Sequence, residues 1–150
     1  MIMNKIEEAV VAFEEMMSDK RKNMMEPMVR CNKGELFILK YLYDKNTAVI
    51  PSEISDAMHT STARISAALG ALEKKGQIHR EIDTTNRRNI LVTITEAGRE
   101  RSLFESNEMR KHLVNILKEM GEGEALEFVR LLKRFSEIAS QVIENKPPNG

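Results

Sequence analysis

The sequence predicts a mainly α-helical fold that contains one small β-hairpin, an α+β arrangement. Apolar residues recur at spacings of three and four over most of the 150 residues, as on one face of a helix. In residues 78–94, isoleucine and valine instead fall at every second position, as in a β-strand. The polar run DTTNRRN interrupts that stretch and indicates the turn of a hairpin.

Length and composition indicate one soluble domain, residues 1–150. The 23 basic and 23 acidic residues balance, so total charge points to neither a nucleic-acid partner nor a membrane. The single cysteine, Cys31, cannot form an intrachain disulfide, and no apolar run is long enough for a signal or membrane segment. We therefore expect a cytoplasmic protein without a membrane partner.

The first predicted helix begins with a capping box, in which Asn4 and Glu7 each bond to the other's backbone. Its apolar stripe is formed by Ile2, Ile6, Val10, Phe13 and Met17. The segment that follows, residues 18–33, combines basic residues with Pro27. It is predicted to be an irregular connection or a kinked helix.

Three shorter helices are expected next. The second helix carries Leu36, Leu39, Leu42 and Tyr43 on its buried side. A short extended piece leads to Pro51, and Ser52 is predicted to cap the third helix. The fourth helix should begin at Ser61 and end at Gly76, because two lysines suit a helix C-terminus and a glycine suits the left-handed residue after it.

The register of the hairpin follows from its alternation. For the apolar residues of both strands to share one face, Ile82 must lie near Ile90, which leaves Arg87 and Arg88 in the loop. Thr95 is then expected to cap a long helix that ends near Met120. A last helix to about residue 144 has a coiled-coil-like seam of Ala125, Phe128, Leu132, Phe135, Ala139 and Val142.

Two short helices joined by a brief turn, with a hairpin directly after the second, predict a winged helix-turn-helix. In this arrangement the second helix enters the major groove of DNA. Its outward face is small rather than charged, and it includes Gly70, although a mid-helix glycine costs about 1 kcal/mol relative to alanine. Close approach to another surface explains this choice. The predicted DNA-binding residues are Ser61, Thr62, Ala63, Arg64, Ser66, Ala67, Arg87 and Arg88.

These residue types suit a groove. Alanine and threonine methyl groups can contact thymine methyls, hydroxyls reach bases or phosphates, and Arg64 can address guanine or phosphate. Arg87 and Arg88 sit where a protruding loop reaches a narrow minor groove. The alternative is that the helix face packs on a protein and the arginines are solvated.

The run from Ser52 to Glu100 resembles the DNA-binding core of the MarR family, the multiple-antibiotic-resistance-type bacterial regulators. The strongest matches are LEKKG at the end of the fourth helix, the segment from Asp83 to Arg88, and LVTITEAG. The resemblance implies a wing-tip role for Arg88 with Arg87 beside it, and groove-facing roles for Thr62, Ala63, Ser66 and Ala67. Asn86 stands where the family often has an acid that braces the arginine.

The resemblance also implies a homodimer, and the apolar stripes at both ends of the chain agree with it. We expect a winged helix-turn-helix core at residues 33–95, with N- and C-terminal dimerisation helices in residues 1–32 and 96–145. The alternative is that these helices fold back over a monomeric core.

No catalytic constellation and no structural-zinc spacing occur in the sequence, so we expect neither an enzyme nor a cofactor. Some relatives bind small aromatic molecules beside the dimerisation helices. The candidates for such a crevice are Phe13, Met17, Met28, Phe37 and Tyr41, with plain core as the alternative. Cys31 as a redox sensor, or Glu108 with His112 as a metal site, is less favoured than an ordinary thiol and a solvated pair.

The sequence thus predicts a sequence-specific, double-stranded DNA-binding transcription regulator. We expect a repressor that binds a pseudo-palindromic site as a homodimer, and release by a small-molecule effector is left open. The alternative is a winged-helix protein–protein interaction module that does not bind DNA.

Overall fold

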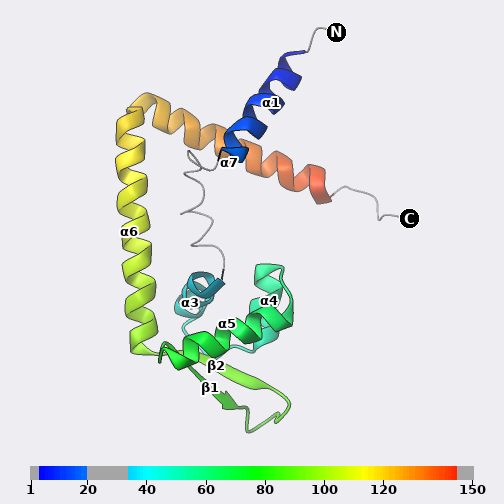
Figure 1. Cartoon of the computed structure of the whole chain (residues 1–150), viewed down its shortest axis with the longest axis vertical. Coiled ribbons are helices and arrows are strands. Elements are labelled where there is room, and N and C mark those ends of the chain that lie inside the picture. Colours follow the sequence, from blue (N-terminus) through cyan, green and yellow to red (C-terminus); the bar gives the residue numbers. More distant parts are fainter. Residues whose placement is uncertain (1–3, 20–33, 145–150) are drawn as a thin grey trace, which may run out of the picture. The chain divides into compact units, whose positions relative to one another are not determined.

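The computed structural model describes residues 4–19 and 34–144, in which helices predominate and one hairpin occurs, as predicted (Figure 1). Of the connection predicted at residues 18–33, Ser18 belongs to α1 and Asp19 caps it, whereas residues 20–33, with Met28 and Cys31, lie outside the described residues. The elements in chain order are α1 (Lys5–Ser18), α3 (Gly34–Lys45), α4 (Pro51–Met58), α5 (Thr62–Lys74), β1 (Ile78–Ile82), β2 (Ile90–Ile94), α6 (Glu96–Met120) and α7 (Glu122–Glu144). The chain divides into two compact units, Met1–Met109 and Arg110–Gly150.

The core of the first unit is built by α3, α4, α5 and the hairpin, which lie together in Figure 1. Its buried side chains are aliphatic and occur at helical spacing in the helices and at alternate positions in the strands. They are Ile38, Leu39, Leu42, Val49, Ile54, Ile65, Leu69, Leu72, Ile78 and Val92. Burying each such side chain stabilises the fold by about 1.5–3 kcal/mol relative to leaving it exposed.

The hairpin has the register that the sequence predicted. β1 and β2 are antiparallel, with Ile82 opposite Ile90. The expected extended piece before α4 adds to this sheet, because Val49 exchanges two backbone hydrogen bonds with Val92, at 3.0 and 2.8 Å. This bridge therefore adds a short extended segment to the β1–β2 hairpin, which is the wing, and connects the base of the wing to the helical core.

Most helix ends follow from their capping residues. Asn4 and Glu7 form the predicted capping box of α1, and the Thr95 hydroxyl accepts a hydrogen bond from Gly98 N at 3.2 Å at the start of α6. The predicted start of α4 was wrong by two residues. The helix begins at Pro51, with Ile50 before it as the cap residue, so Ser52 lies inside the first turn. Proline suits this place because its fixed φ is helical and its missing N–H would have had no partner there.

On α1 and α7, in contrast to the core, most apolar side chains are exposed. No residue of α1 is buried, and only Ala125 is buried on α7. Large apolar side chains on both helices are exposed, from 41% at Val11 to 74% at Ile6. None of the described helices is both long enough and apolar enough to cross a membrane.

Candidate nucleic-acid interface

The second helix of the helix-turn-helix, α5, has one buried side and one exposed side. Ile65, Leu69 and Leu72 point into the core and are at most 1% exposed. Every helix residue predicted to contact DNA is exposed, namely Thr62, Ala63, Arg64, Ser66 and Ala67. The core therefore orients α5 so that its small side chains face away from the protein.

The N-terminus of α5 is capped, yet it keeps free donors. The Ser61 hydroxyl accepts a hydrogen bond from Arg64 N at 3.4 Å. The amides of Thr62 and Ala63 belong to the first turn, where no carbonyl of the helix can accept from them. Together with the positive end of the helix dipole, these donors suit an anion such as a phosphate.

Gly70 continues the exposed side of α5. A Cβ atom placed there would meet no atom within 4 Å. The packing of this chain therefore does not require glycine at this position. The side of α5 that carries Ala63, Ala67 and Gly70 is open to another molecule.

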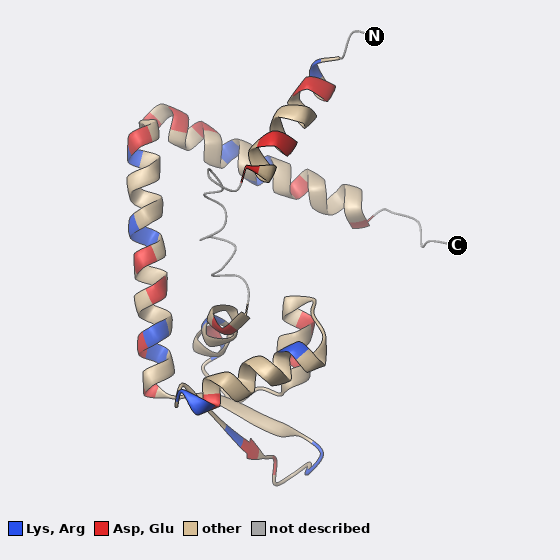
Figure 2. Ribbon diagram, in the orientation of Figure 1, with Lys and Arg blue, Asp and Glu red and all other residues tan. Residues whose placement is uncertain are grey.

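The wing tip carries Arg87 and Arg88, both exposed, and appears in blue at the end of the hairpin in Figure 2. Backbone hydrogen bonds close the loop, from Asp83 N to Asn89 O at 3.0 Å and from Asn89 N to Asn86 O at 2.8 Å. The Asn86 side chain accepts from Arg88 N at 3.3 Å. Asn86 thus holds the backbone of the arginine, although it lacks the charge that relatives often have at this position.

Asp83 braces the other side of the loop. Its carboxylate accepts from the hydroxyl of Thr85 at 2.7 Å and from the backbone N of Thr85 at 2.9 Å. These hydrogen bonds from Thr85 lower the pKa of Asp83, so the carboxylate is charged while it braces the loop. The loop is therefore structured by its own side chains before any DNA is bound.

Ion pairing separates the basic residues of the helix-turn-helix and wing, residues 51–94, into two groups. Lys75 pairs with Glu35 at 2.7 Å, and Arg80 pairs with Glu73 at 2.9 Å. The other basic side chains of this stretch form no ion pair or hydrogen bond within the described chain; they are Arg64, Lys74, Arg87 and Arg88. The unpaired cations lie on the exposed part of α5 and at the wing tip, where a phosphate backbone could neutralise them.

The sequence did not reveal a cavity of about 440 Å³ beside the turn between α4 and α5. Its wall includes Ile38, Met58, His59, Thr60, Arg64 and Ala68. His59 has a left-handed backbone, with φ of 50°, and this conformation turns the chain sharply between the two helices. A short polar turn between two predicted helices was the available sequence signal, and it does not show which side chains converge.

The residues predicted to form a ligand crevice do not line this cavity. Phe37 and Tyr41 stack on α3, with ring centroids 6.2 Å apart. Phe13 and Met17 lie on α1, where they are 48% and 42% exposed. Met28 lies outside the described residues.

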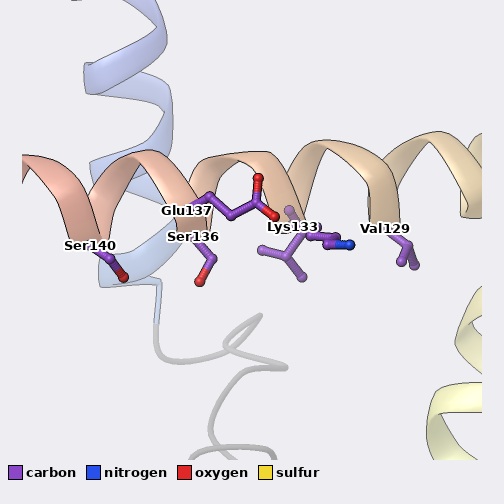
Figure 3. A pocket seen from close by; sticks show the side chains of 6 residues that line it. Val129, Lys133, Ser136, Glu137 and Ser140 are labelled. Atoms are coloured by element: carbon purple, nitrogen blue, oxygen red, sulfur yellow. The ribbon is translucent and has the colours of Figure 1, made fainter.

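A second hollow, of about 410 Å³, runs along α7 (Figure 3). Its lining residues all belong to that one helix: Val129, Leu132, Lys133, Ser136, Glu137 and Ser140. Figure 3 shows their side chains side by side along the helix rather than around an enclosed space. The hollow is therefore part of the exposed surface of α7.

No three His, Cys, Asp or Glu side chains gather to hold a metal ion in residues 4–19 and 34–144. Glu108 and His112 both lie on α6, four residues apart. Cys31 lies outside the described residues.

Comparison with known proteins identifies the same part of the chain. A family model for the winged helix DNA-binding domain matches residues 35–113, just over half of the chain. No curated protein matches this sequence.

Solved structures share the fold across most of the chain. The YusO protein from Bacillus subtilis is 19% identical with a TM-score of 0.68, over 88% of this chain and 94% of that one. A structure of MarR is 18% identical with a TM-score of 0.64, over 97% and 100%. FabT from Streptococcus pneumoniae, in complex with DNA, is 18% identical with a TM-score of 0.58, over 91% and 92%. At these identities the likeness concerns the fold.

Proposed function

Because this chain belongs to the winged helix DNA-binding domain family and has the fold of the MarR-family regulators, we propose that it is a sequence-specific transcription regulator of double-stranded DNA. The separation of paired and unpaired cations carries this proposal. Arg64, Lys74, Arg87 and Arg88 are unpaired within the described chain, whereas the neighbouring Lys75 and Arg80 are held by carboxylates. A chain of zero net charge can thus present a basic surface to phosphates.

The parts of this surface have different tasks. The amides of Thr62 and Ala63 would position α5 on a phosphate, which fixes orientation without reading sequence. Ala63, Ser66 and Ala67 would then lie against base edges in the major groove, where methyl groups and a hydroxyl discriminate between bases. Arg87 and Arg88 would reach an adjacent minor groove.

We propose that the active form is a homodimer. Apolar side chains cover about half the circumference of α7, which is more than one neighbouring helix needs for packing. The exposed members are Phe128, Val129, Leu131, Leu132, Phe135, Ile138 and Val142. A second copy that covers this face would bury them, and two-fold symmetry would present two copies of α5 to half-sites about one helical turn apart.

Repression is the simplest mode for such a dimer, since occupancy of a pseudo-palindromic site would exclude other proteins from that DNA. We place this activity in the cytoplasm. A small-molecule effector would fit the cavity beside the turn from α4 to α5, whose volume of about 440 Å³ lies within the usual range for ligand sites. Arg64 belongs both to that wall and to the DNA-facing residues, so an anionic ligand there would compete with DNA for it.

The salt dependence of binding tests the proposal. Duplexes selected from a random pool by the wild-type protein would be titrated by fluorescence anisotropy at several salt concentrations. Wild type should show a steep negative slope of log affinity against log salt, and Arg88→Ala should make it shallower by about one. A flat and weak response would instead favour the protein-interaction module that the small face of α5 also allows.

A further inference from the structure

A cluster of charged side chains joins three helices behind the DNA-facing surface. Glu35, in the first turn of α3, accepts hydrogen bonds from Lys75 Nζ at 2.7 Å and from Arg101 Nη1 at 2.8 Å. Lys75 is the cap residue directly after α5, and Arg101 lies in the second turn of α6. Arg101 Nη1 also donates to Gln77 Oε1 at 2.7 Å, in the turn after α5. One carboxylate therefore connects the end of α5 to the start of α6.

Backbone contacts strengthen the same junction. Thr95 N donates to Gln77 O at 3.1 Å, and the Thr95 hydroxyl donates to Gly76 O at 2.7 Å. Gly98, in the first turn of α6, lies so close to this turn that a Cβ atom would collide with Gln77 O and come within 2.8 Å of Ile94 Cγ1. The first turn of α6 is thus seated directly on the turn that ends α5.

The cluster is partly shielded from water. The side chains of Glu35 and Arg101 are 23% and 27% exposed, whereas Lys75 is 50% exposed. Hydrogen bonds from Lys75 and then from Arg101 lower the pKa of Glu35, although its partial burial opposes them. Glu35 is therefore ionised at neutral pH. Of its two pairs, the one with Arg101 is the better shielded and should hold the junction more firmly.

The charged contacts of this cluster lie at the C-terminal end of α5. Glu73 adds to it, because its carboxylate accepts two hydrogen bonds from Arg80 of β1, at 2.9 and 3.2 Å. At the other end, the side chains of Thr62 and Arg64 form no hydrogen bond within the described chain. Charged contacts thus hold the end of α5 near α6, whereas the end that would read DNA is held by core packing through Ile65, which is 1% exposed.

We propose that Glu35 is a positioning residue that fixes α5 to the first turns of α6 and so sets how the two recognition helices of a dimer are presented to DNA. This inference rests on the proposed function, because it requires both DNA and a second copy. When the winged helix-turn-helix cores of both subunits are held in place before binding, the second core meets its half-site at high effective concentration once the first core is bound. If the contact between the end of α5 and the first turns of α6 is loosened, that effective concentration falls, while the contacts of each core with its own half-site stay unchanged.

Glu35→Gln in the full chain tests the inference. The substitution keeps the shape of the side chain and removes its charge. It also places an amide N–H donor beside the donors Lys75 and Arg101, which weakens the cluster. Affinity would be measured for a palindromic duplex selected by wild type and for the same duplex with one half-site scrambled. We expect the affinity for the full site to fall about tenfold, the affinity for the half-site to stay within twofold, and the salt slope to remain unchanged.

Asp44→Asn is the matched control, because it removes one carboxylate from the same helix, where Asp44 pairs with Lys40 in an exposed ion pair at 3.0 Å. It changes the net charge by the same amount and should leave both affinities near wild type. Arg101→Lys is a second test that retains the charge but replaces the guanidinium, whose Nη1 donates to both Glu35 and Gln77, with an ammonium on a shorter side chain. Its loss of full-site affinity should be smaller and in the same direction.

Equal losses on full-site and half-site duplexes would overturn the positioning role, because Glu35 would then serve only the fold of a single core. Full-site binding by Glu35→Gln that matches Asp44→Asn would overturn it as well. Failure of the wild-type protein to bind either duplex in a salt-dependent way would contradict the proposed function itself, and the two failures are thus distinguishable.

Discussion

The winged-helix core and the helices α1 and α7 use similar apolar residues with opposite results. In the core, Leu39, Leu42 and Leu72 are fully buried by the chain's own helices and sheet. On α7, Leu131 and Leu132 are 47% and 46% exposed. The difference is one of surroundings, because the core elements surround one another, whereas the large apolar side chains of α7 are exposed. The core is buried by the chain's own elements, and the exposed face of α7 is where we propose that a second copy binds.

Truncating the core should have the largest effect. Leu39→Ala removes a side chain that is 0% exposed, so the free energy of unfolding should fall by about 2–5 kcal/mol from lost burial and the cavity that remains. Urea unfolding followed by circular dichroism measures this change. A loss below about 1 kcal/mol would show that Leu39 is not part of a tightly packed core.

A charge on the exposed apolar face of α7 should act on association instead. Leu132→Asp places a carboxylate where we propose the dimer interface, and it should weaken dimerisation by at least about 2 kcal/mol, the cost of burying a charge without a partner. Sedimentation equilibrium at micromolar concentration should show the 17.2 kDa monomer for this variant and a dimer for wild type.

Gln141→Asp is the control for this variant, because it introduces the same charge on the polar side of the same helix. It should remain dimeric. A wild-type mass of one subunit, or a dimer that tolerates Leu132→Asp, would contradict an interface on this face.

Gly70→Ala should separate stability from binding on α5. A Cβ atom meets nothing there, so the better helix former should raise the free energy of unfolding by about 1 kcal/mol. The same methyl group should weaken DNA binding, because it stands on the side that we propose approaches the groove. Urea unfolding and anisotropy on one preparation measure both effects, and unchanged affinity would show that DNA does not come close at this position.

The smallest effect concerns pH. The pKa of Glu35 is lowered in the folded chain, so its pairs stabilise the protein above the ordinary value of 4.5 and cease to do so as pH falls through the lowered pKa. Glu35→Gln should therefore be less stable than wild type at pH 6, with a gap that narrows as pH falls below 4.5. Urea midpoints across this range measure the gap, and a gap independent of pH would exclude ionisation as its cause.

The sequence predicted features that depend on neighbours along the chain. Ser61 and Gly76 delimit α5 because a cap and a left-handed residue act locally, and Ile82 lies opposite Ile90 because alternation sets the register. The start of α4 was misplaced, since Pro51 and Ser52 are both good residues for a helix start and proline took the first position.

The sequence could not predict features that depend on tertiary approach. Lys75 and Glu35 are 40 residues apart, and Arg101 and Glu35 are 66 apart, so no local pattern joins them. The cavity beside His59 likewise depends on how α3 meets the turn between α4 and α5. The DNA-facing role of the residues on α5 and at the wing tip stays a prediction.

The buried and exposed sides of α5 have different roles, and this separation affects how such a protein can change over evolution. The buried side and the tied end of the helix support the fold, whereas the side chains of Thr62, Ala63, Ser66 and Ala67 are exposed and contribute little to it. Substitutions at these four positions could therefore accumulate at little cost in stability. If these residues read DNA, as we propose, a new DNA target could be acquired by substitutions on this surface without changes to the buried core that supports it.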